Sequence, residues 1–276
     1  MRATVVVPTY QEADNIATLL RRIRTAAPAV SVLVVDDGSP DGTADVVEAI
    51  GATVDDVEVL RRTSKQGLAS AYQAGFAHAI AGGADVVITM DADLSHDPIV
   101  IPMLLEASES GADLVIGSRY VPGGRILDWT APRRALSSCG NRYATSALRL
   151  PVRDATSGYR AYRADVIDVE DMRLIRASGY GFLIEMAYRL VRRGGKLVEV
   201  PITFVDRQHG TSKISSHSVL EAAVLVTLWG GRDWMSDRRA RRLVETDSRR
   251  PQLISHRAFN VPLPLPRDRR WRQFRG

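Results

Sequence analysis

The stretch ADVVITMDADLSHDP, residues 84–98, joins a strand pattern to a pair of acidic residues. Five apolar or β-prone residues run from Val86 to Met90, and Asp91 and Asp93 follow with one alanine between them. A continuous apolar run of this length predicts a strand that is buried on both faces. Two carboxylates so close together repel each other unless a cation lies between them. The end of this strand is therefore a candidate site for a bound cation.

The alternation of strand and helix extends from this stretch in both directions. Helices with apolar residues at helical spacing are predicted between the strands. The strands are predicted at residues 3–10, 31–37, 57–62, 85–91 and 112–120, and the helices at 12–26, 41–51, 67–83 and 98–111. This pattern is typical of an α/β fold of the nucleotide-binding type, with a parallel sheet covered by helices on both faces.

Polar residues follow each predicted strand. The strands end in PTYQE, VDDGSPDGT, RRTSKQGLA, MDADLSHDP and GSRY. In open parallel sheets, ligands bind beyond the carboxyl ends of the strands, where these segments converge. The sequence therefore predicts one ligand site built from five strand ends.

Composition narrows the class of protein. The chain has 276 residues, of which 45% are hydrophobic and 25% charged, as is usual for a globular protein. Cys139 is the only cysteine, which excludes an internal disulfide and a multi-cysteine zinc site and fits a reducing compartment. The first residues enter a strand without a signal-peptide pattern, and the longest apolar run, residues 219–229, is too short to span a bilayer.

The positive charge of the chain lies at its C-terminal end. Residues 236–276 hold twelve arginines and four acidic residues, a net charge of +8, so residues 1–235 carry −3 of the total of +5. With four prolines and little apolar periodicity, this segment is predicted to be a mostly disordered basic tail. It is either a solubilising extension or an arm for anionic lipid, to which each basic residue contributes about 1 kcal/mol. Because no nucleic-acid motif accompanies the charge, no nucleic-acid partner is expected.

A divalent, oxygen-preferring ion would relieve the repulsion between Asp91 and Asp93. Mg²⁺ or Mn²⁺ is typically held by one or two carboxylates, with nucleotide phosphate oxygens as further ligands. The Asp-Ala-Asp sequence therefore predicts a metal that carries a diphosphate, and Ser95 is a candidate for a further oxygen ligand. We expect His96 to orient the loop rather than bind the metal. The alternative is a solvated turn, because this pattern alone is common.

The residues after the second strand fit a nucleotide. A carboxylate there commonly accepts a hydrogen bond from a ribose hydroxyl or a base edge, and Asp36 and Asp37 are both candidates. We expect Asp37 to cap the following turn, GSPDGT at residues 38–43, which leaves Asp36 for the nucleotide.

Six stretches, taken in order, resemble the inverting family-2 glycosyltransferases of the GT-A fold, and among these the polyprenyl- or dolichyl-phosphate mannosyltransferases. They are VVVPTYQEADNI (5–16), VVDDGSPDGT (34–43), MDADLSHDP (90–98), GSRYVPGG (117–124), TSGYRAYR (156–163) and EVPITFVDRQHGTSK (199–213). The likeness covers about residues 3–235. It implies a GT-A catalytic domain at 1–235 that moves mannose from GDP-mannose to a polyprenyl monophosphate and forms a β-linked phosphosugar.

The resemblance also implies roles for individual residues. The guanosine site would be lined by Pro8, Tyr10, Glu12, Val34 and Asp36; the metal and diphosphate would be held by Asp91, Ala92 and Asp93, with Ser95 near the metal; Arg207 and Lys213 would clamp the diphosphate from a mobile loop; and Arg119 and Arg133 would face the acceptor phosphate. The predicted catalytic residues are thus Asp93, Arg119 and Arg133. The sequence departs from the family at Gln11, where Asn is usual, and at Leu183, where Gln is usual.

Elementary chemistry agrees with these roles. A phosphate monoester has its second pKa near about 6 and is largely dianionic at neutral pH, so a strong general base is not required. Positive charge is required to bring two anions together, and planar guanidinium groups suit phosphate oxygens. Glu185 is either an acceptor-side carboxylate or a structural residue of its helix.

A lipid acceptor raises the question of how the chain reaches a membrane. The helix predicted at residues 214–235 contains Trp229 and Trp234 and is expected either to pack on the domain or to lie at the bilayer surface. We expect a cytoplasmic protein that is peripheral at the cytoplasmic face of the membrane, held there by its basic tail or by a membrane-anchored partner.

Three other functions compete with this interpretation. A nucleotidyltransferase would carry a glycine-rich, basic loop after the first strand, where this chain has the acidic PTYQEADN. A non-catalytic membrane-binding module would not need the intact Asp-Ala-Asp sequence. The nearest alternative is the same fold with UDP-glucose or another nucleotide sugar and another lipid acceptor.

Overall fold

A computed structural model describes residues 1–175, 177–206 and 216–247 of the chain. The chain divides into two units, of which the first comprises Met1–Asp233 and contains the predicted site. Of the second unit, which begins at Trp234, the structure describes the segment up to Asp247. Arg207 and Lys213, the predicted diphosphate clamp, lie outside the described residues.

The first half of the chain alternates strands and helices as the apolar periodicity predicts. The elements are β1 (Ala3–Thr9), α1 (Ala13–Ala26), β2 (Ser31–Asp36), α2 (Thr43–Gly51), β3 (Val57–Arg61), α3 (Leu68–Ala81), β4 (Val86–Thr89), the 3₁₀ turn η1 (Pro98–Val100), α4 (Ile101–Glu109) and β5 (Leu114–Ser118). Every residue of β4 is buried, as expected from its continuous apolar run.

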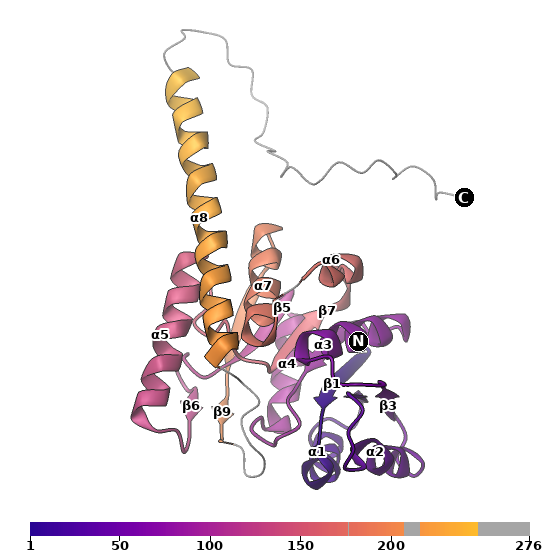
Figure 1. Ribbon diagram of the computed structural model, residues 1–276. Helices are drawn as coiled ribbons and strands as arrows, with labels where there is room; N and C mark the ends of the chain where they lie inside the picture. Colours follow the sequence, from indigo (N-terminus) through magenta and orange to yellow (C-terminus); the bar gives the residue numbers. More distant parts are fainter. Residues whose placement is uncertain (176, 207–215, 248–276) are drawn as a thin grey trace, which may run out of the picture. The chain divides into compact units, whose positions relative to one another are not determined.

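The second half adds helices and shorter strands. They are β6 (Arg125–Ile126), α5 (Ala131–Ala147), β7 (Arg160–Arg163), the 3₁₀ turn η2 (Ala164–Val166), α6 (Val169–Arg173), α7 (Gly179–Arg192), β8 (Leu197–Pro201), β9 (Thr203–Phe204) and α8 (Ser216–Asp247). Figure 1 shows α5 beside the first part of α8, and the hydroxyls of Tyr143 on α5 and Thr227 on α8 are hydrogen-bonded at 2.6 Å.

The main sheet has seven strands in the order β3-β2-β1-β4-β7-β5-β8, and β6 and β9 form a separate pair. The sheet is mostly parallel, which confirms the predicted fold class, but β7 runs antiparallel between β4 and β5. The apolar pattern did not predict this strand, because Arg-Ala-Tyr-Arg has a charged residue at each end. The carboxyl ends of β1, β2, β4 and β5 still meet at one edge, since β4 and β5 are both antiparallel to β7.

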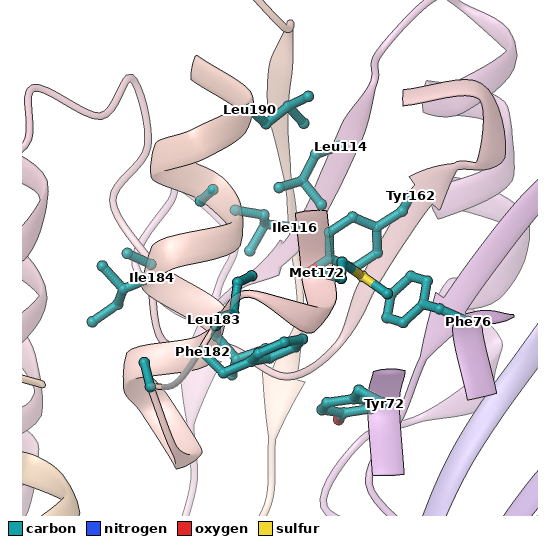
Figure 2. Close-up of a cluster of buried hydrophobic side chains, with 14 of the residues drawn as sticks. Tyr72, Phe76, Leu114, Ile116, Tyr162, Met172, Phe182, Leu183, Ile184 and Leu190 are labelled. Carbon is teal, nitrogen blue, oxygen red and sulfur yellow. The ribbon is translucent and has the colours of Figure 1, made fainter. Parts of the chain in front are cut away.

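Two hydrophobic cores cover the two faces of the sheet. Successive side chains of a strand point to opposite faces, so Val6 of β1 joins one core and Val5 and Val7 join the other. The first core packs against α3, α5, α6, α7 and α8, and the second against α1, α2 and α4. Figure 2 shows the aromatic part of the first core, where the rings of Tyr72 on α3 and Phe182 on α7 are stacked with centroids 6.0 Å apart.

Helix α8 is longer than the helix predicted at residues 214–235. It continues to Asp247, into the segment for which the sequence predicts a disordered tail. That part of the sequence, SDRRARRLVETD, contains four arginines, and arginine has a high helix propensity. Residues 248–276 lie outside the described part of the chain.

Candidate active site

Two adjoining pockets lie at the carboxyl ends of the strands. The larger pocket has a volume of about 320 Å³ and is lined by residues after β1, β2 and β3. The smaller pocket, of about 90 Å³, is lined by residues after β5 and from the segment that leads into β7. The two pockets share five residues, Leu68, Asp91, Asp93, Gly179 and Tyr180. The acidic pair at the end of β4 therefore stands at the boundary between two binding spaces.

The turn after β4 fixes the two carboxylates. The side chain of Asp91 is 38% exposed, and one of its oxygens accepts a hydrogen bond from the buried hydroxyl of Tyr72 at 3.4 Å. Asp93 is 8% exposed, and its Oδ1 accepts from the backbone N–H of Ser95 at 3.1 Å. Leu94, which lies between Asp93 and Ser95, has a φ of +62°, a conformation that non-glycine residues rarely adopt. Strain of this kind is typical of functional turns.

His96 orients this turn, as the sequence predicts. Its Nδ1 accepts a hydrogen bond from the backbone N–H of Asp91 at 3.3 Å, and its ring stacks on that of Tyr159 with centroids 5.0 Å apart. Burial lowers the pKa of His96, and this effect exceeds the opposing effect of Asp91 and Asp93. The neutral ring has an acceptor nitrogen, which agrees with the observed hydrogen bond.

The residues at this turn fit a divalent metal that also binds phosphate. Among the described residues, no three His, Cys, Asp or Glu side chains gather in a way that would hold a metal by themselves. Magnesium-type sites usually need only one or two carboxylates, because substrate phosphates and water supply the other oxygens. The hydroxyl of Ser95 is buried and has no hydrogen-bond partner within the described part of the chain, which leaves an oxygen available. Asp91, Asp93 and Ser95 are thus a chemically suitable ligand set.

The end of β1 brings three predicted residues to the larger pocket. Pro8, Tyr10 and Glu12 all line it. Gln11, between the last two, has a φ of +57° and donates its N–H to the hydroxyl of Ser39 at 2.9 Å. Asparagine adopts this left-handed conformation more readily than other non-glycine residues, so the site tolerates the departure from the family at some backbone cost.

The cap of the turn after β2 is Asp36 and not Asp37, so the expected assignment of the cap is wrong. Asp36 caps the turn: its carboxylate accepts from the N–H and hydroxyl of Ser39 at 2.9 and 2.5 Å and from the hydroxyl of Thr9 at 2.9 Å. Asp37 does not cap it, because successive residues of an extended chain point to opposite sides.

Asp37 binds the loop after β3 instead. Its Oδ2 accepts from the backbone N–H groups of Gln66 and Gly67 at 3.0 and 3.2 Å, and its Oδ1 pairs with Arg62 at 2.7 Å. This loop carries Lys65, whose ammonium group lies 4.2 Å from the centroid of the Tyr10 ring. Asp37 lines the larger pocket.

Arg119 lies in the wall of the smaller pocket and is almost fully buried. Its Nε and Nη2 donate to the two oxygens of Asp154 at 2.7 and 2.8 Å, and Nη2 also donates to the hydroxyl of Thr156 at 2.8 Å. Burial lowers the pKa of Arg119, but the charge and hydrogen bonds of Asp154 outweigh burial and raise it above its usual value. The guanidinium group is thus a fixed cation in the pocket wall.

Arg133, at the start of α5, lines the same pocket and is more exposed. Its Nη1 pairs with Asp206 at 2.5 Å, and its guanidinium group lies 4.3 Å from the centroid of the Trp129 ring. Trp129 also lines the pocket, and its buried indole N–H has no hydrogen-bond partner within the described part of the chain. The smaller pocket therefore combines two guanidinium groups with an unused N–H donor.

The structure brings most, but not all, of the predicted residues to the pockets. Those that line one or both are Pro8, Tyr10, Glu12, Asp91, Ala92, Asp93, Arg119 and Arg133. The described residues that line the two pockets do not include Val34, Asp36 or Ser95. Val34 is fully buried in the second core. Glu185 lines neither pocket and accepts two hydrogen bonds from Arg189, at 2.8 and 2.6 Å, as a structural residue of α7.

Sequence reasoning missed several residues that shape the smaller pocket. Asp154 and Arg160 are both fully buried, although charged residues are rarely so. Arg160 donates to the carbonyl oxygens of Ser157, Leu183 and Ala155 at 2.7, 2.7 and 2.6 Å, and so ties the pocket wall to α7. Arg160 lies within the family motif TSGYRAYR, but no local pattern gives it a role.

The chain is similar to a known protein family and to known proteins. The model of the family "Glycosyl transferase family 2" matches residues 4–169. The undecaprenyl-phosphate mannosyltransferase of Micrococcus luteus is 49% identical over 230 residues, which are 83% of this chain and 94% of that protein. The polyprenol monophosphomannose synthase of Mycolicibacterium smegmatis is 44% identical over 230 residues, or 83% and 87% of the two chains.

Solved structures give the fold. The glucosyl-3-phosphoglycerate synthase of Mycobacterium tuberculosis, solved with Mn²⁺, UDP and glucosyl-3-phosphoglycerate, matches with a TM-score of 0.60 at 22% identity over 82% of this chain and 78% of that one. A mannosyltransferase from Pyrobaculum calidifontis, solved with GDP-mannose and Mn²⁺, matches with a TM-score of 0.53 at 18% identity over 90% and 79% of the two chains. These matches confirm the predicted GT-A fold.

Proposed function

Because this chain belongs to glycosyl transferase family 2, we propose that it is an inverting mannosyltransferase that moves mannose from GDP-mannose to a polyprenyl monophosphate. The product is a polyprenyl-phosphate β-mannose. The names of the two relatives from Micrococcus luteus and Mycolicibacterium smegmatis, both more than 40% identical, support a polyprenyl-phosphate acceptor and a mannosyl donor.

The observation that carries the proposal is the position of Asp91 and Asp93 between the two pockets. The larger pocket, on the side of Tyr10 and Glu12, has room for the nucleoside of a donor. The smaller pocket, on the side of Arg119 and Arg133, offers cations to a second phosphate. A sugar held at the acidic pair would lie between the donor diphosphate and the acceptor phosphate, as a direct displacement requires.

The residues of the chain support the reaction by holding two anions in line. The acceptor phosphate is its own nucleophile, because its second pKa is near about 6 and it is largely dianionic at neutral pH. One of its oxygens bonds to the anomeric carbon as the bond from that carbon to the diphosphate breaks, which inverts the configuration. Arg119 and Arg133 orient the acceptor phosphate. A divalent ion held by Asp91, Asp93 and Ser95 would supply positive charge to the departing diphosphate.

The donor sugar and the acceptor can be tested directly. We expect the purified chain, given Mn²⁺ and a short polyprenyl phosphate, to transfer sugar from GDP-mannose and to leave UDP-glucose and other nucleotide sugars largely unused. Transfer from UDP-glucose in preference to GDP-mannose would identify a different donor on the same fold. Release of pyrophosphate from a nucleoside triphosphate and a sugar phosphate would instead identify a nucleotidyltransferase.

A lipid acceptor requires contact with a membrane. No helix among the described residues is long and apolar enough to cross a bilayer. We infer that the enzyme acts as a peripheral protein at the cytoplasmic face. Two features support this: the basic segment 236–276 with its net charge of +8, and an exposed apolar row on α8 formed by Leu220, Val224 and Leu228 at helical spacing.

Removal of the basic segment tests its contribution to membrane binding apart from that of the apolar row on α8. We expect the truncation that lacks residues 236–276 to lose activity on acceptor embedded in anionic vesicles and to keep activity on a short, water-soluble acceptor. The reason is that the attraction is electrostatic and screened over about 8 Å at physiological ionic strength, so vesicle binding by the full chain should also fall as salt rises.

A second truncation controls for damage to α8, which continues to Asp247. Removal of residues 248–276 takes away eight arginines and one aspartate but leaves the helix whole, and it should reduce vesicle binding in the same direction. Vesicle pelleting equal to that of the full chain, in both truncations, would show that the tail is not the anchor and would favour the apolar row of α8.

A further inference from the structure

We propose that Asp154 is a positioning residue that presents Arg119 to the acceptor phosphate in the smaller pocket. This inference rests on the proposed function for the identity of the acceptor. Asp154 lies 35 residues from Arg119 in the sequence and two residues before the start of the family motif at 156–163, and it does not line the pocket itself.

The geometry of the pair decides which nitrogen of Arg119 remains for a ligand. Oδ2 of Asp154 accepts from both Nε and the backbone N–H of Arg119, at 2.7 and 3.1 Å, while Oδ1 accepts from Nη2 at 2.8 Å. The hydroxyl of Thr156 accepts a further bond from Nη2 at 2.8 Å. The structure gives Nη1 no hydrogen bond to any described residue. A guanidinium group whose Nε and Nη2 are held in this way presents its Nη1 to an anion in a fixed direction.

Asp154 is itself held rigidly, as a positioning residue must be. Its backbone N–H and that of Arg153 donate to the two carboxylate oxygens of Glu199 on β8, at 2.9 and 2.8 Å. Its Oδ1 accepts a further bond from the backbone N–H of Ser157 at 3.1 Å. The carboxylate is therefore anchored to the sheet and to the segment that forms the pocket wall.

Buried charges behind the smaller pocket favour an anion there when a divalent ion offsets Asp91 and Asp93, which line the same pocket. Arg119 and Asp154 form a nearly neutral pair, but the fully buried guanidinium of Arg160 makes no hydrogen bond to a carboxylate among the described residues. The three buried side chains thus carry one net positive charge beside the pocket. Burial of this kind weakens solvent screening and lengthens the reach of the charge.

A role for Asp154 as general base does not fit these observations. Burial raises its pKa, but the charge of Arg119 and its hydrogen bonds outweigh burial, so the pKa lies below its usual value. Both carboxylate oxygens already accept hydrogen bonds, and the side chain is fully buried. A group that takes up a proton in the reaction needs contact with the substrate and a pKa near the working pH.

The test uses Asp154→Asn in the full chain and measures acceptor and donor separately. The asparagine preserves the shape but replaces a charged acceptor by an amide, so Arg119 loses a charge-assisted partner. We expect binding of a short prenyl monophosphate, measured by calorimetry with GDP and Mn²⁺ present, to weaken by about 10- to 100-fold, the size of a hydrogen bond to a charged group. We expect donor binding to change by less than about twofold, because the larger pocket makes no use of Asp154.

Two further variants separate positioning from a purely structural role. Glu185→Gln removes a carboxylate from another arginine pair, at a site that lines neither pocket, and should leave prenyl-phosphate binding within about twofold of wild type. Arg119→Lys should weaken prenyl-phosphate binding as Asp154→Asn does. The double variant should bind prenyl phosphate as well as the weaker of the two single variants, because both changes remove the same contact.

Each contrary result has a distinct meaning. Losses that multiply in the double variant would overturn the inference, since the two residues would then act independently. Equal losses of donor binding and acceptor binding in the Asp154→Asn variant would also overturn the inference, because the substitution would then disturb the whole site and not the acceptor pocket alone. A third result would refute the proposed function and keep this inference: the wild-type chain transfers no sugar, but it binds prenyl monophosphate and Asp154→Asn weakens that binding.

Discussion

Replacement of Asp93 by alanine is expected to lower turnover by about 100-fold or more with little change in stability. Even the outer partners of a bound metal typically contribute about 10- to 100-fold, and Asp93 is a direct candidate ligand at the boundary of the two pockets. The fold should survive, because Asp93 lies beyond the end of β4 and its carboxylate accepts a hydrogen bond from the N–H of Ser95 within the same turn. Initial rates with saturating GDP-mannose and polyprenyl phosphate measure the first effect, and thermal unfolding the second.

Asp97→Ala is the matched control for this variant. Asp97 lies in the same loop and lines neither pocket; its carboxylate accepts from the N–H of Ile99 and pairs with Arg22 at the surface. Loss of such a cap costs about 1 kcal/mol of stability, and activity should remain. Calorimetry with GDP and Mn²⁺ gives a readout apart from turnover, since Asp93→Ala should weaken metal-dependent nucleotide binding. Full turnover by the wild-type chain in excess chelator would contradict the predicted metal requirement.

Replacement of Arg160 by methionine is expected to lower the free energy of unfolding by about 3 kcal/mol or more. The side chain is fully buried and donates to three carbonyl oxygens, those of Ala155, Ser157 and Leu183. Methionine has a similar length but no donors, so these buried acceptors would lose their partners, each at a cost of about 1–3 kcal/mol. Urea unfolding followed by circular dichroism measures the loss.

The same strand supplies the control. Arg163 also lies on β7, but its side chain is 36% exposed and pairs with Asp165 at the surface. Surface ion pairs contribute at most about 1 kcal/mol, so Arg163→Met should be nearly neutral. Equal losses in the two variants would mean that the strand, and not the buried hydrogen bonds, sets the stability. Because Arg160 also holds the wall of the smaller pocket, Arg160→Met should affect acceptor binding more than donor binding.

The sequence by itself determined the elements whose information is local. The apolar runs of β1, β2 and β4 and the apolar faces of α1 and α3 follow from the periods of strand and helix, and the structure has them within a few residues of the predicted bounds. The position of Asp91 and Asp93 at the edge of the sheet that carries the two pockets followed from the same pattern, because the carboxyl ends of parallel strands meet at one edge. For these elements the local sequence pattern and the geometry of the sheet predict the same positions.

The tertiary structure alone decided where the remaining charges meet. The short strand β7 lies antiparallel between β4 and β5, and its pairing depends on residues that are 40 or more positions away in the chain. That insertion brings Asp154 beside Arg119 and places the charge of Arg160 near Asp154. The choice between Asp36 and Asp37 as the cap of the second turn likewise depends on which face of the strand meets Thr9 and Ser39. A buried charge is stable only with its partners in place, and those partners come from separate strands that meet only in the folded sheet.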